Sequence, residues 1–520
     1  MTTGKVYLVG AGPGDPELIT VKGRRRLDEA DVVVYDYLAN PALLDTLAPE
    51  VECIYVGKRH GNHHLPQGQI NQLLIDKARE GAVVVRLKGG DPFIFGRGGE
   101  EATALAGSGV PFEVIPGITA ATAVTAYAGI PLTHRGVNAS VTFVTGSEDP
   151  EREETMIRWK ELGRASETLV FFMGMRSLPV IARRLIEGGR AADTPAAVIR
   201  WGTHPCQQTV TGTLDNLAAH VSEAGIRPPA LIVVGDVVRF REQINWFESL
   251  PLFGRRILVT RAASQKGTLV RALADLGAEV VGVPTIRIVD PQDFAPLDDA
   301  IGALERMDWV VLTSKNGVEH FFRRLNALGK DSRALAGCQV AVVGRETAKA
   351  MEAAGVKADL VPEHSHAEGL AEAMMARGVA GKQVLLAQAE QARAVLPETL
   401  SAGGASVTAV TVYRTVCPEA DDTTMAALTD PRGFDYVTFT SGSTVRNLNR
   451  ILGNDRFHAI LKGTRIAAIG PVTGDAAGKA GLSVDLMPDN PDIPSLVATI
   501  REDAATRRRT DAQHARGETR

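Results

Sequence analysis

Two glycine-rich turns near the start of the sequence contain residue types that let a ligand approach the backbone closely. The first, Gly10-Ala-Gly-Pro-Gly-Asp15, follows a predicted strand, and Asp36 ends the next predicted strand. This order resembles a dinucleotide-binding fingerprint with its ribose-binding carboxylate. The fit fails because Asp15 places a negative charge where a pyrophosphate would approach, and Pro13 removes a backbone donor. The pattern therefore disfavours an NAD-dependent enzyme.

The second glycine-rich turn is Gly89-Gly90-Asp91, which lies between a predicted strand and a predicted helix. The two glycines allow close approach of a ligand, and Asp91 supplies a fixed negative charge. Such a turn suits a cation with an amine or a sulfonium, and it does not suit a triphosphate because no P-loop Lys-Ser/Thr follows. A third turn, Ile115–Ala121, leads into a helix of small residues against which an adenine could lie.

The second half of the sequence repeats a turn rich in hydroxyl groups. Thr313–Val318 and Thr440–Val445 each follow a predicted strand, and each is followed at nearly equal separation by a strand that ends in Gly344 or Gly470. Two similar lobes facing a cleft explain this pattern, and a chance match between strand–turn–helix units is the alternative. Hydroxyls and backbone N–H groups at such turns bind carboxylates, although the same residues also serve as helix N-caps. The candidate binding residues are Ser314, Asn316, Thr347, Ser441, Ser443, Thr444 and Thr473.

Short β-branched runs that alternate with helical stretches must position these turns. The alternation predicts an α/β fold with mainly parallel strands. The predicted strands are Lys5–Val9, Asp31–Tyr35, Val83–Leu87, Val141–Thr145, Thr168–Phe172, Ala196–Ile199, Leu231–Val234, Arg256–Thr260, Trp309–Thr313, Gln339–Val343, Gln383–Ala387, Tyr436–Thr440 and Arg465–Ile469.

The length of 520 residues indicates about three domains, or two large ones. The rhythm of strands breaks at Phe240–Gly254, which predicts a first domain over 1–245, a linker over 246–254, a second domain over 255–502 and a flexible tail over 503–520. A net charge of −4 and only 5% aromatic residues argue against nucleic acid as a partner. No signal peptide or membrane-spanning run is evident, so we expect a cytoplasmic protein without a membrane partner.

The first half resembles uroporphyrinogen-III C-methyltransferase over about residues 4–243. The strings that carry the resemblance are GAGPGDPELIT, VVVYD, VGKRHGNHHLPQGQIN, VRLKGGDPFIFGRGGEE, PGITA, GIPLTHR, FFMGM and PPALIVVGDVV. The resemblance implies a two-lobed tetrapyrrole methylase domain that uses S-adenosylmethionine (SAM) to methylate uroporphyrinogen III twice, which gives precorrin-2. It also implies a homodimer that forms through this domain.

Matching the motifs residue by residue implies the roles of individual side chains. Asp36 matches the family's proposed proton acceptor and Lys58 its proposed donor, whereas a helix-capping carboxylate and a simple carboxylate-binding lysine are the alternatives. Arg59, His63 and Arg135 are further candidates for binding the acetate and propionate groups of the substrate. The implied SAM contacts are Pro13, Gly89, Gly90, Asp91, Ile94, Thr119, Ala120, Met173, Gly202 and Ala230.

Metal ligands are not expected among these residues. His60, His63 and His64 are close in sequence, but no fourth ligand is spaced nearby and the family uses no metal. The four cysteines contain no C-x-x-C spacing, which also argues against a zinc site or a disulfide framework.

The second half resembles uroporphyrinogen-III synthase over about residues 255–502. The matching strings are LVTR, LTSKNGV, AVVGRETAKAM, VTVYRTV, FTSGSTV, IAAIGPVTGDAA and IPSLV. The resemblance implies a two-lobed α/β domain, discontinuous in its first lobe, that cyclises hydroxymethylbilane to uroporphyrinogen III. Tyr413 matches a tyrosine proposed to assist loss of the substrate hydroxyl, and a buried structural tyrosine is the alternative. A non-catalytic tetrapyrrole-binding module is the other interpretation of this half.

Overall fold

The structure is a computed structural model that describes residues 3–57, 65–147, 156–165, 167–260 and 267–517. Its contacts divide the chain into two compact units, which are considered separately. Unit 1 comprises Met1–Arg256, Ala272–Glu279 and Arg501–Arg520, and unit 2 comprises Ile257–Arg271 and Val280–Ile500.

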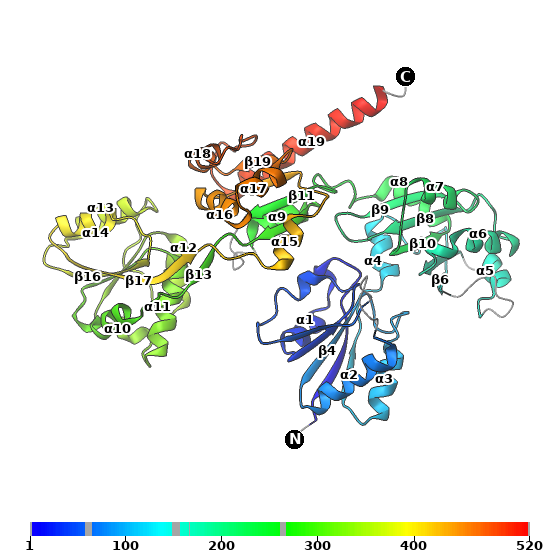
Figure 1. The fold of residues 1–520 in the computed structure, drawn as a ribbon, viewed down its shortest axis with the longest axis horizontal. Coiled ribbons are helices and arrows are strands. Elements are labelled where there is room, and N and C mark those ends of the chain that lie inside the picture. The colour runs from blue at the N-terminus through cyan, green and yellow to red at the C-terminus, as the bar shows by residue number, and fades with distance from the viewer. Residues whose placement is uncertain (1–2, 58–64, 148–155, 166, 261–266, 518–520) are drawn as a thin grey trace. The chain divides into compact units, whose positions relative to one another are not determined.

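The first lobe of unit 1 is a parallel sheet with helices packed against it (Figure 1). The strands lie in the order β3-β2-β4-β1-β5, so β4 and β1 are central and their carboxyl ends meet at one edge. Valine and leucine side chains of the central strands form the core with α2 and α3. The elements are β1 (Lys5–Gly10), α1 (Val21–Asp28), β2 (Val32–Tyr35), β3 (Glu52–Tyr55), α2 (Gln67–Arg79), β4 (Val83–Lys88), α3 (Gly98–Gly107) and β5 (Phe112–Ile115).

The second lobe of unit 1 has a mixed sheet in the order β6-β7-β10-β8-β9. Only β6 and β7 pair in parallel, whereas β10 runs antiparallel to both of its neighbours and β8 and β9 form an antiparallel pair. The prediction of mainly parallel strands is therefore wrong for this lobe, because alternation of elements carries no information on strand direction. The elements are α4 (Ala120–Tyr127), β6 (Val141–Thr145), α5 (Trp159–Ala165), β7 (Thr168–Phe172), α6 (Leu178–Glu187), β8 (Pro195–Arg200), β9 (Gln208–Thr213), α7 (Leu217–Glu223), β10 (Ala230–Val234) and α8 (Arg241–Ile244).

The segment predicted as a linker, residues 246–254, is packed onto unit 1 instead. Phe247 and Leu252 are buried, and the ring of Tyr127 makes edge contacts with Trp246 and Phe247. Trp246 Nε1 donates to the carbonyl of Ala126 at 3.0 Å. The correction has a simple cause: the segment lacks strand or helix periodicity, but its large apolar side chains still need to be buried.

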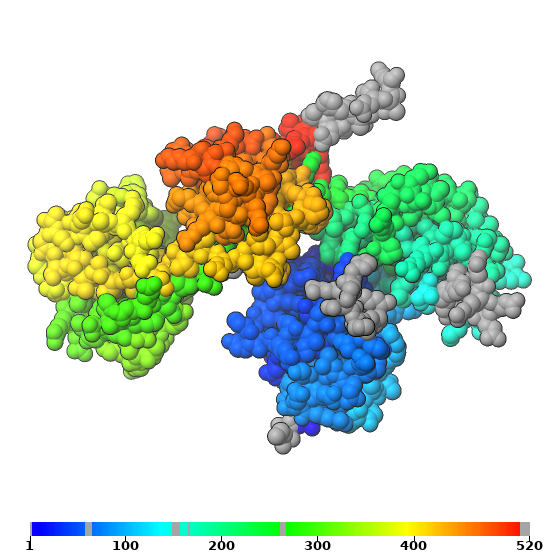
Figure 2. Space-filling view, in the orientation of Figure 1, coloured from blue at the N-terminus to red at the C-terminus, as the bar shows by residue number. Residues whose placement is uncertain are grey.

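Unit 2 also has two lobes, which Figure 2 shows in yellow and green on one side and mainly in orange and red on the other. One lobe is built on the sheet β12-β11-β18-β19, whose strands come from both ends of the unit, as the resemblance implied. Its elements are β11 (Arg256–Thr260), α9 (Thr268–Asp275), β12 (Glu279–Val283), α15 (Asp422–Leu428), β18 (Tyr436–Phe439), α16 (Gly442–Leu452), α17 (Asn454–Leu461), β19 (Arg465–Ala468), α18 (Pro471–Lys479) and α19 (Ile493–Gly517). The parts of β11, α9, β12 and α19 that fall within Met1–Arg256, Ala272–Glu279 and Arg501–Arg520 are counted in unit 1 by their contacts.

The other lobe of unit 2 is continuous in sequence and contains the sheet β13-β17-β16-β14-β15. The strand β14 pairs in parallel with β15 and β16, and β16 pairs in parallel with β17, whereas β13 runs antiparallel to β17. Its elements are β13 (Arg287–Val289), α10 (Ala295–Gly302), β14 (Trp309–Leu312), α11 (Lys315–Ala327), β15 (Gln339–Val342), α12 (Arg345–Ala353), α13 (Ala367–Arg377), β16 (Gln383–Ala389), α14 (Val395–Ala402) and β17 (Ser406–Val416).

The internal repeat that the sequence predicted is present in these two lobes. β14 and β18 each lead into a helix through the repeated hydroxyl-rich turn, and β15 and β19 each lead into a helix through a glycine. The copies share a further feature, since Asp359 accepts from the backbone N–H of Val340 at 2.7 Å and Asp485 accepts from that of Ile466 at 2.8 Å. The two lobes are therefore built to one local plan.

The C-terminal region differs from the tail predicted by composition. Residues from Asp503 onward continue α19 as far as Gly517, and the Arg508 guanidinium donates to the carbonyl of Phe253 at 2.7 Å. Basic and acidic residues interleaved without apolar periodicity therefore form an extended helix here rather than an irregular end.

Candidate functional site

The three glycine-rich turns of unit 1 meet at the carboxyl edge of the first sheet. Gly12 and Gly90 exchange backbone hydrogen bonds, with 2.7 Å from Gly90 N to Gly12 O. A Cβ on Gly117 would lie 2.2 Å from the carbonyl oxygen of Gly90, so only glycine fits there. Gly90 itself has a φ of +69°, which favours glycine on conformational grounds. The predicted cofactor loops therefore form one cluster.

Asp91 fixes this cluster through its side chain. Its Oδ1 accepts from the backbone N–H of Phe93 at 2.8 Å, and its Oδ2 accepts from that of Gly117 at 3.0 Å. The carboxylate thus joins the turn after β4 to the turn after β5 and holds a negative charge between them. Sequence reasoning predicted the fixed charge but did not predict this bridge.

Helix α4 carries the cluster toward the second lobe. Its N-cap Thr119 and first residue Ala120 lie against Gly90, with 3.7 Å from an ideal Gly90 Cβ to Ala120 N. Further along, the side chain of Val124 fills the space beside Gly202, where an added Cβ would lie 2.3 Å from it. Ala230 at the start of β10 pairs in register with Arg200 at the end of β8, two residues before Gly202. These predicted contacts therefore lie along one helix and the strand ends beside it.

Exposed apolar side chains border the same region. Ile94 lies in an exposed turn with Phe93 and Phe95, and Met173 after β7 is 55% exposed with a φ of +55°. The rings of Phe95 and Phe172 are 5.1 Å apart, which brings the turn containing Ile94 near the strand end that carries Met173. Exposed apolar groups next to strained backbone are typical of a ligand site.

The turn that contains Pro13 is held from both lobes. Asp15 accepts a hydrogen bond from the Tyr127 hydroxyl at 2.8 Å, and its backbone N–H donates to Thr203 Oγ1 at 2.9 Å. Burial, together with the hydrogen bond to Asp15, raises the pKa of Tyr127 well above its usual range. Asn40 Nδ2 donates to the carbonyl of Gly14 at 2.6 Å. Neither Tyr127 nor Thr203 was expected from the sequence.

Asp36 lies at the end of β2 and is held at both carboxylate oxygens. Oδ1 accepts from the backbone N–H of Leu38 at 3.1 Å, and Oδ2 accepts from Arg86 Nη2 at 2.9 Å. Leu38 also approaches Gly89, since a Cβ on that glycine would lie 2.4 Å from the Leu38 Cβ. The predicted proton acceptor is therefore fixed next to the glycine cluster.

Behind Asp36 lies a group of buried charges that sequence reasoning missed. Arg86, Lys88 and Glu101, named here the buried charge cluster, have side chains that are 4%, 5% and 0% exposed. Glu101 Oε1 accepts from Arg86 Nε at 3.2 Å and from Lys88 Nζ at 2.9 Å. Burial, with the neighbouring Arg86, lowers the pKa of Lys88. The sequence did contain a signal for these buried charges, because a strand that reads Val-Arg-Leu-Lys puts two cations in the middle of a sheet.

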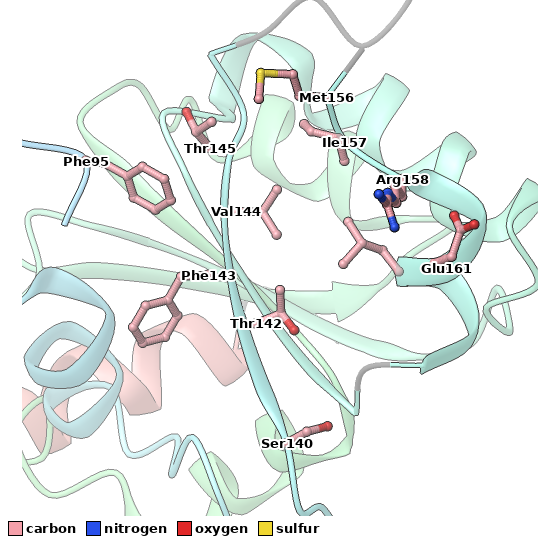
Figure 3. Close-up of a pocket in the computed structure, with 11 residues that line it drawn as sticks. Phe95, Ser140, Thr142, Phe143, Val144, Thr145, Met156, Ile157, Arg158 and Glu161 are labelled. Atoms are coloured by element: carbon pink, nitrogen blue, oxygen red, sulfur yellow. The ribbon is translucent and has the colours of Figure 1, made fainter.

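A cavity lies elsewhere in unit 1, along β6 at the edge of the second sheet (Figure 3). Its volume is about 620 Å³, with Phe95 and Phe143 on one side of the strand and Val144 and Ile157 on the other. None of the predicted site residues lines it. The cavity is therefore not the predicted cofactor site.

The remaining predicted residues of unit 1 are only partly described. Arg135 is exposed in the turn before β6, at the surface of the second lobe. Lys58, Arg59 and His63 lie outside the described residues. Within the described parts of the chain, no group of three or more metal-binding side chains is found, and no helix is long and apolar enough to cross a membrane.

In unit 2, Tyr413 lies beside the first hydroxyl-rich turn. Its side chain is largely buried in the lobe core, and its hydroxyl is 3.1 Å from Ser314 Oγ. The same Ser314 Oγ accepts from the backbone N–H of Gly317 at 3.0 Å and so caps α11. The ring of His320 lies 5.7 Å from that of Tyr413, and burial, with Arg323, lowers the pKa of His320. His320 was not singled out in the sequence.

The second hydroxyl-rich turn has the same backbone but different side-chain partners. Ser441 Oγ bonds to Ser443 Oγ at 2.8 Å and does not cap α16. Thr444 is buried and donates to the carbonyl of Ser441 at 2.7 Å. Asn316 is half-buried in the first turn of α11, whereas Thr347 and Thr473 are buried in the first turns of α12 and α18. The predicted hydroxyls therefore include both surface-facing and buried groups.

Comparisons with known proteins agree with this division of the chain. Residues 5–218 match the family of tetrapyrrole (corrin/porphyrin) methylases, and residues 267–498 match the uroporphyrinogen-III synthase HemD family. The porphyrin biosynthesis protein HemD of Ruminiclostridium josui is 38% identical over 96% of this chain and 98% of its own.

Two further proteins are similar to part of the chain. The uroporphyrinogen-III C-methyltransferase of Bacillus subtilis (strain 168) is 43% identical over 64% of this chain and 68% of its own. The uroporphyrin-III C-methyl transferase structure from Thermus thermophilus, complexed with S-adenyl homocysteine, is 42% identical, with a TM-score of 0.39 over 45% of this chain and 99% of its own. The predicted resemblance is confirmed: the chain belongs to a family of porphyrin biosynthesis proteins in which a tetrapyrrole methylase region is followed by a uroporphyrinogen-III synthase region.

Proposed function

We propose that unit 1 transfers methyl groups from SAM to two carbons of uroporphyrinogen III and so forms precorrin-2. We propose further that unit 2 forms uroporphyrinogen III by cyclising hydroxymethylbilane. The observation that carries the first assignment is the convergence of three glycine turns, the bridged carboxylate of Asp91 and the charge-paired Asp36 at one sheet edge. The names of the relatives support the choice of substrate.

The residues of unit 1 fit SAM because they combine a close backbone approach, a fixed negative charge and exposed apolar groups. We assign SAM contacts to the ten residues predicted from the sequence, with Asp91 facing positive charge and Ile94 and Met173 supplying apolar surface. When bound, SAM supplies an electrophilic methyl group carried on a sulfonium. The rest of SAM is the leaving group, with its sulfur as a neutral thioether. The turns hold the donor in line with the accepting carbon.

Proton transfer completes each methylation. The new bond to carbon leaves a positively charged ring system that must lose a proton. Asp36 has the position and the fixed orientation to accept that proton, and Lys58 is the proposed donor. Arg135, Arg59 and His63 are proposed to bind substrate carboxylates.

Unit 2 must grip a flexible polyanion while one ring turns over. Hydroxyls and helix N-termini suit this task because they bind carboxylates with only partial charge. Loss of the substrate hydroxyl as water leaves an azafulvene, which closes at a substituted carbon. We propose that Tyr413, held against Ser314, assists departure of that hydroxyl.

One observation favours a second candidate function for unit 2. Thr347, Thr444 and Thr473 are at most 4% exposed, so these three predicted carboxylate-binding hydroxyls face the interior. A methylase joined to a non-catalytic tetrapyrrole-binding unit would need fewer exposed hydroxyls than an enzyme that rearranges its substrate.

Incubation of the full chain with hydroxymethylbilane, with and without SAM, tests both assignments. Without SAM we expect the type III isomer in excess of the type I isomer that forms spontaneously, and with SAM we expect dimethylated tetrapyrrole. Supplied uroporphyrinogen III with SAM is the control for unit 1 alone. Only type I product from hydroxymethylbilane, with methylation of supplied uroporphyrinogen III intact, would favour the binding unit.

A homodimer formed through unit 1 is proposed as the working assembly. Sedimentation equilibrium of the full chain tests it, and a monomer at micromolar concentration would contradict it.

A further inference from the structure

Among the charged side chains that the structure describes in the first lobe of unit 1, Arg86, Lys88 and Glu101 are buried. The buried charge cluster of Arg86, Lys88 and Glu101 contains two cations and one anion within hydrogen-bonding distance. Asp36 adds the second anion through Arg86 and balances the charge. Because isolated buried charges cost several kcal/mol each, such a group persists only when every member is paired.

Further contacts hold the cluster in place, although Glu101 Oε2 is buried without a hydrogen-bond partner. Glu101 Oε1 also accepts from Gln67 Nε2 at 3.1 Å, which fixes the anion from α2. Arg86 Nη1 donates to the carbonyl of Leu87 at 3.0 Å, so the guanidinium plane is set by its own strand. Asp36, which pairs with Arg86 of the cluster, has 26% of its side chain exposed and therefore reaches solvent. The buried charge cluster is therefore linked, through Asp36, to the candidate site.

The geometry points to Arg86 as a positioning residue for Asp36 in methyl transfer, with Glu101 and Lys88 holding Arg86 in place. This inference rests on the proposed function of Asp36 as proton acceptor. Arg86 contacts neither substrate nor SAM in this role. The planar guanidinium is needed because its Nε bonds to Glu101 while its Nη2 bonds to Asp36. A lysine ammonium cannot reproduce this geometry.

The arrangement also separates proton acceptance from cofactor binding. Asp36 is held by Arg86 and Leu38, whereas Asp91 is held by Phe93 and Gly117, so the two carboxylates share none of these partners. A change at Arg86 should therefore lower the methylation rate without weakening SAM binding.

The test is a set of variants of the full chain, assayed with supplied uroporphyrinogen III and SAM. Arg86→Met is expected to lower kcat by about 10- to 100-fold, the range for a lost hydrogen bond to a charged group. The Kd for SAM, measured by calorimetry, should stay within about twofold of wild type. Arg24→Met is the matched control, because Arg24 is likewise a multiply bonded arginine of the first lobe, but its carboxylate partner is Asp28, which does not bond to the buried charge cluster or to Asp36 in the described contacts.

A double-mutant cycle with Asp36→Asn distinguishes positioning from a general structural effect. If Arg86 acts through Asp36, adding Arg86→Met to Asp36→Asn lowers kcat no further. Multiplicative effects of the two changes would overturn the inference.

Arg86→Lys covers the case in which Arg86→Met does not fold, since the lysine keeps a cation beside Glu101. We expect this variant to fold, to bind SAM and to recover only part of the rate. A wild-type kcat in Arg86→Lys would also overturn the inference. Absence of methylation by the wild-type chain, despite SAM binding, would instead contradict the proposed function itself.

Discussion

The two units differ in the kind of polar group that they bury. Unit 1 buries Arg86, Lys88 and Glu101, together with Arg256 at the start of β11, whereas the buried polar residues described between Ile257 and Ile500 of unit 2 are all threonines. A buried charge must be matched by another charge, but a threonine hydroxyl can be satisfied by a nearby backbone carbonyl. The candidate site of unit 1 should therefore be sensitive to single changes of charge, and that of unit 2 should respond more mildly.

The largest effect is expected from Glu101→Gln, which leaves Arg86 and Lys88 buried with one partner fewer. Breaking a buried ion pair in this way costs about 3–5 kcal/mol in the free energy of unfolding. Urea unfolding is measured by fluorescence in a Trp309→Phe background, in which the remaining tryptophans lie in unit 1. The neighbouring Glu100→Gln, in an exposed pair with Arg97, is the control and should cost below about 1 kcal/mol. If Glu101→Gln and Glu100→Gln lowered the free energy of unfolding equally, unit 1 would not be specially sensitive to changes of its buried charges.

Asp91→Ala should have the next largest effect, because it removes the bond to Gly117 that joins the turns after β4 and β5 and the bond to Phe93 that fixes the first of these turns. Two bonds to a charged acceptor, each of about 1.5 kcal/mol or more, correspond to a rise in the Kd for SAM of roughly 100-fold. Calorimetry measures that Kd, and formation of the type III isomer by the same variant is the control. Unchanged SAM affinity would remove this turn from the cofactor site.

Tyr127→Phe tests a single hydroxyl at the junction of the lobes. It removes the bond to Asp15 but keeps the ring packed on Trp246 and Phe247, so we expect SAM to bind about tenfold more weakly. Tyr7→Phe, inside β1 where Lys5 and Arg26 lie over the ring, should leave SAM binding as it is. If both variants bind SAM like wild type, the Pro13 turn is held well enough by Thr203 and Asn40 alone.

Much of this fold could be predicted from the sequence, and the misses share a physical cause. Every predicted strand is present within two residues of its predicted ends, because buried β-branched runs such as Val83–Lys88 are long and distinctive. The strands that escaped prediction were β3, β5, β9, β12, β13 and β17, several of which lie at sheet edges or alternate with polar residues. The packed segment after α8 was missed because packing of Phe247 depends on residues far away in sequence.

In the candidate site, too, features set by neighbouring residues were predicted, and contacts between distant residues were not. The glycine turns and Asp36 were predicted because each signal lies within a few residues. The Arg86–Asp36 pair and the Tyr127–Asp15 bond were not, since both join residues from separate elements. The hydroxyl turns of unit 2 were predicted as a set, but their burial depends on packing that local sequence does not specify.

Tyr413→Phe measures the milder response expected of unit 2. Loss of one bond between neutral hydroxyls, worth about 0.5–1.5 kcal/mol, should slow formation of the type III isomer by roughly two- to tenfold. Methylation of supplied uroporphyrinogen III by the same variant should not change. A rate equal to wild type would reduce Tyr413 to a packing role, and a loss of several hundredfold would place it among the most sensitive positions.

The smallest effect on stability is expected from Glu113→Gln, because the charge of Glu113 is partly exposed and not buried. Glu113 on β5 pairs with Lys22 and with Lys5, and these bonds lower the pKa of the carboxyl to about 2 from an ordinary value of 4.5. A depressed carboxyl pKa stabilises the folded state above the ordinary value, and this contribution disappears as the pH falls toward the folded value. Glu113→Gln should therefore lower the Tm slightly at pH 7, and the variant and wild type should converge between about pH 4.5 and pH 2. Added salt should shrink the difference at pH 7, because solvent-exposed pairs are screened, whereas the cost of Glu101→Gln should change little. A difference that survives both acid and salt would mean that Glu113 acts through packing rather than through its charge.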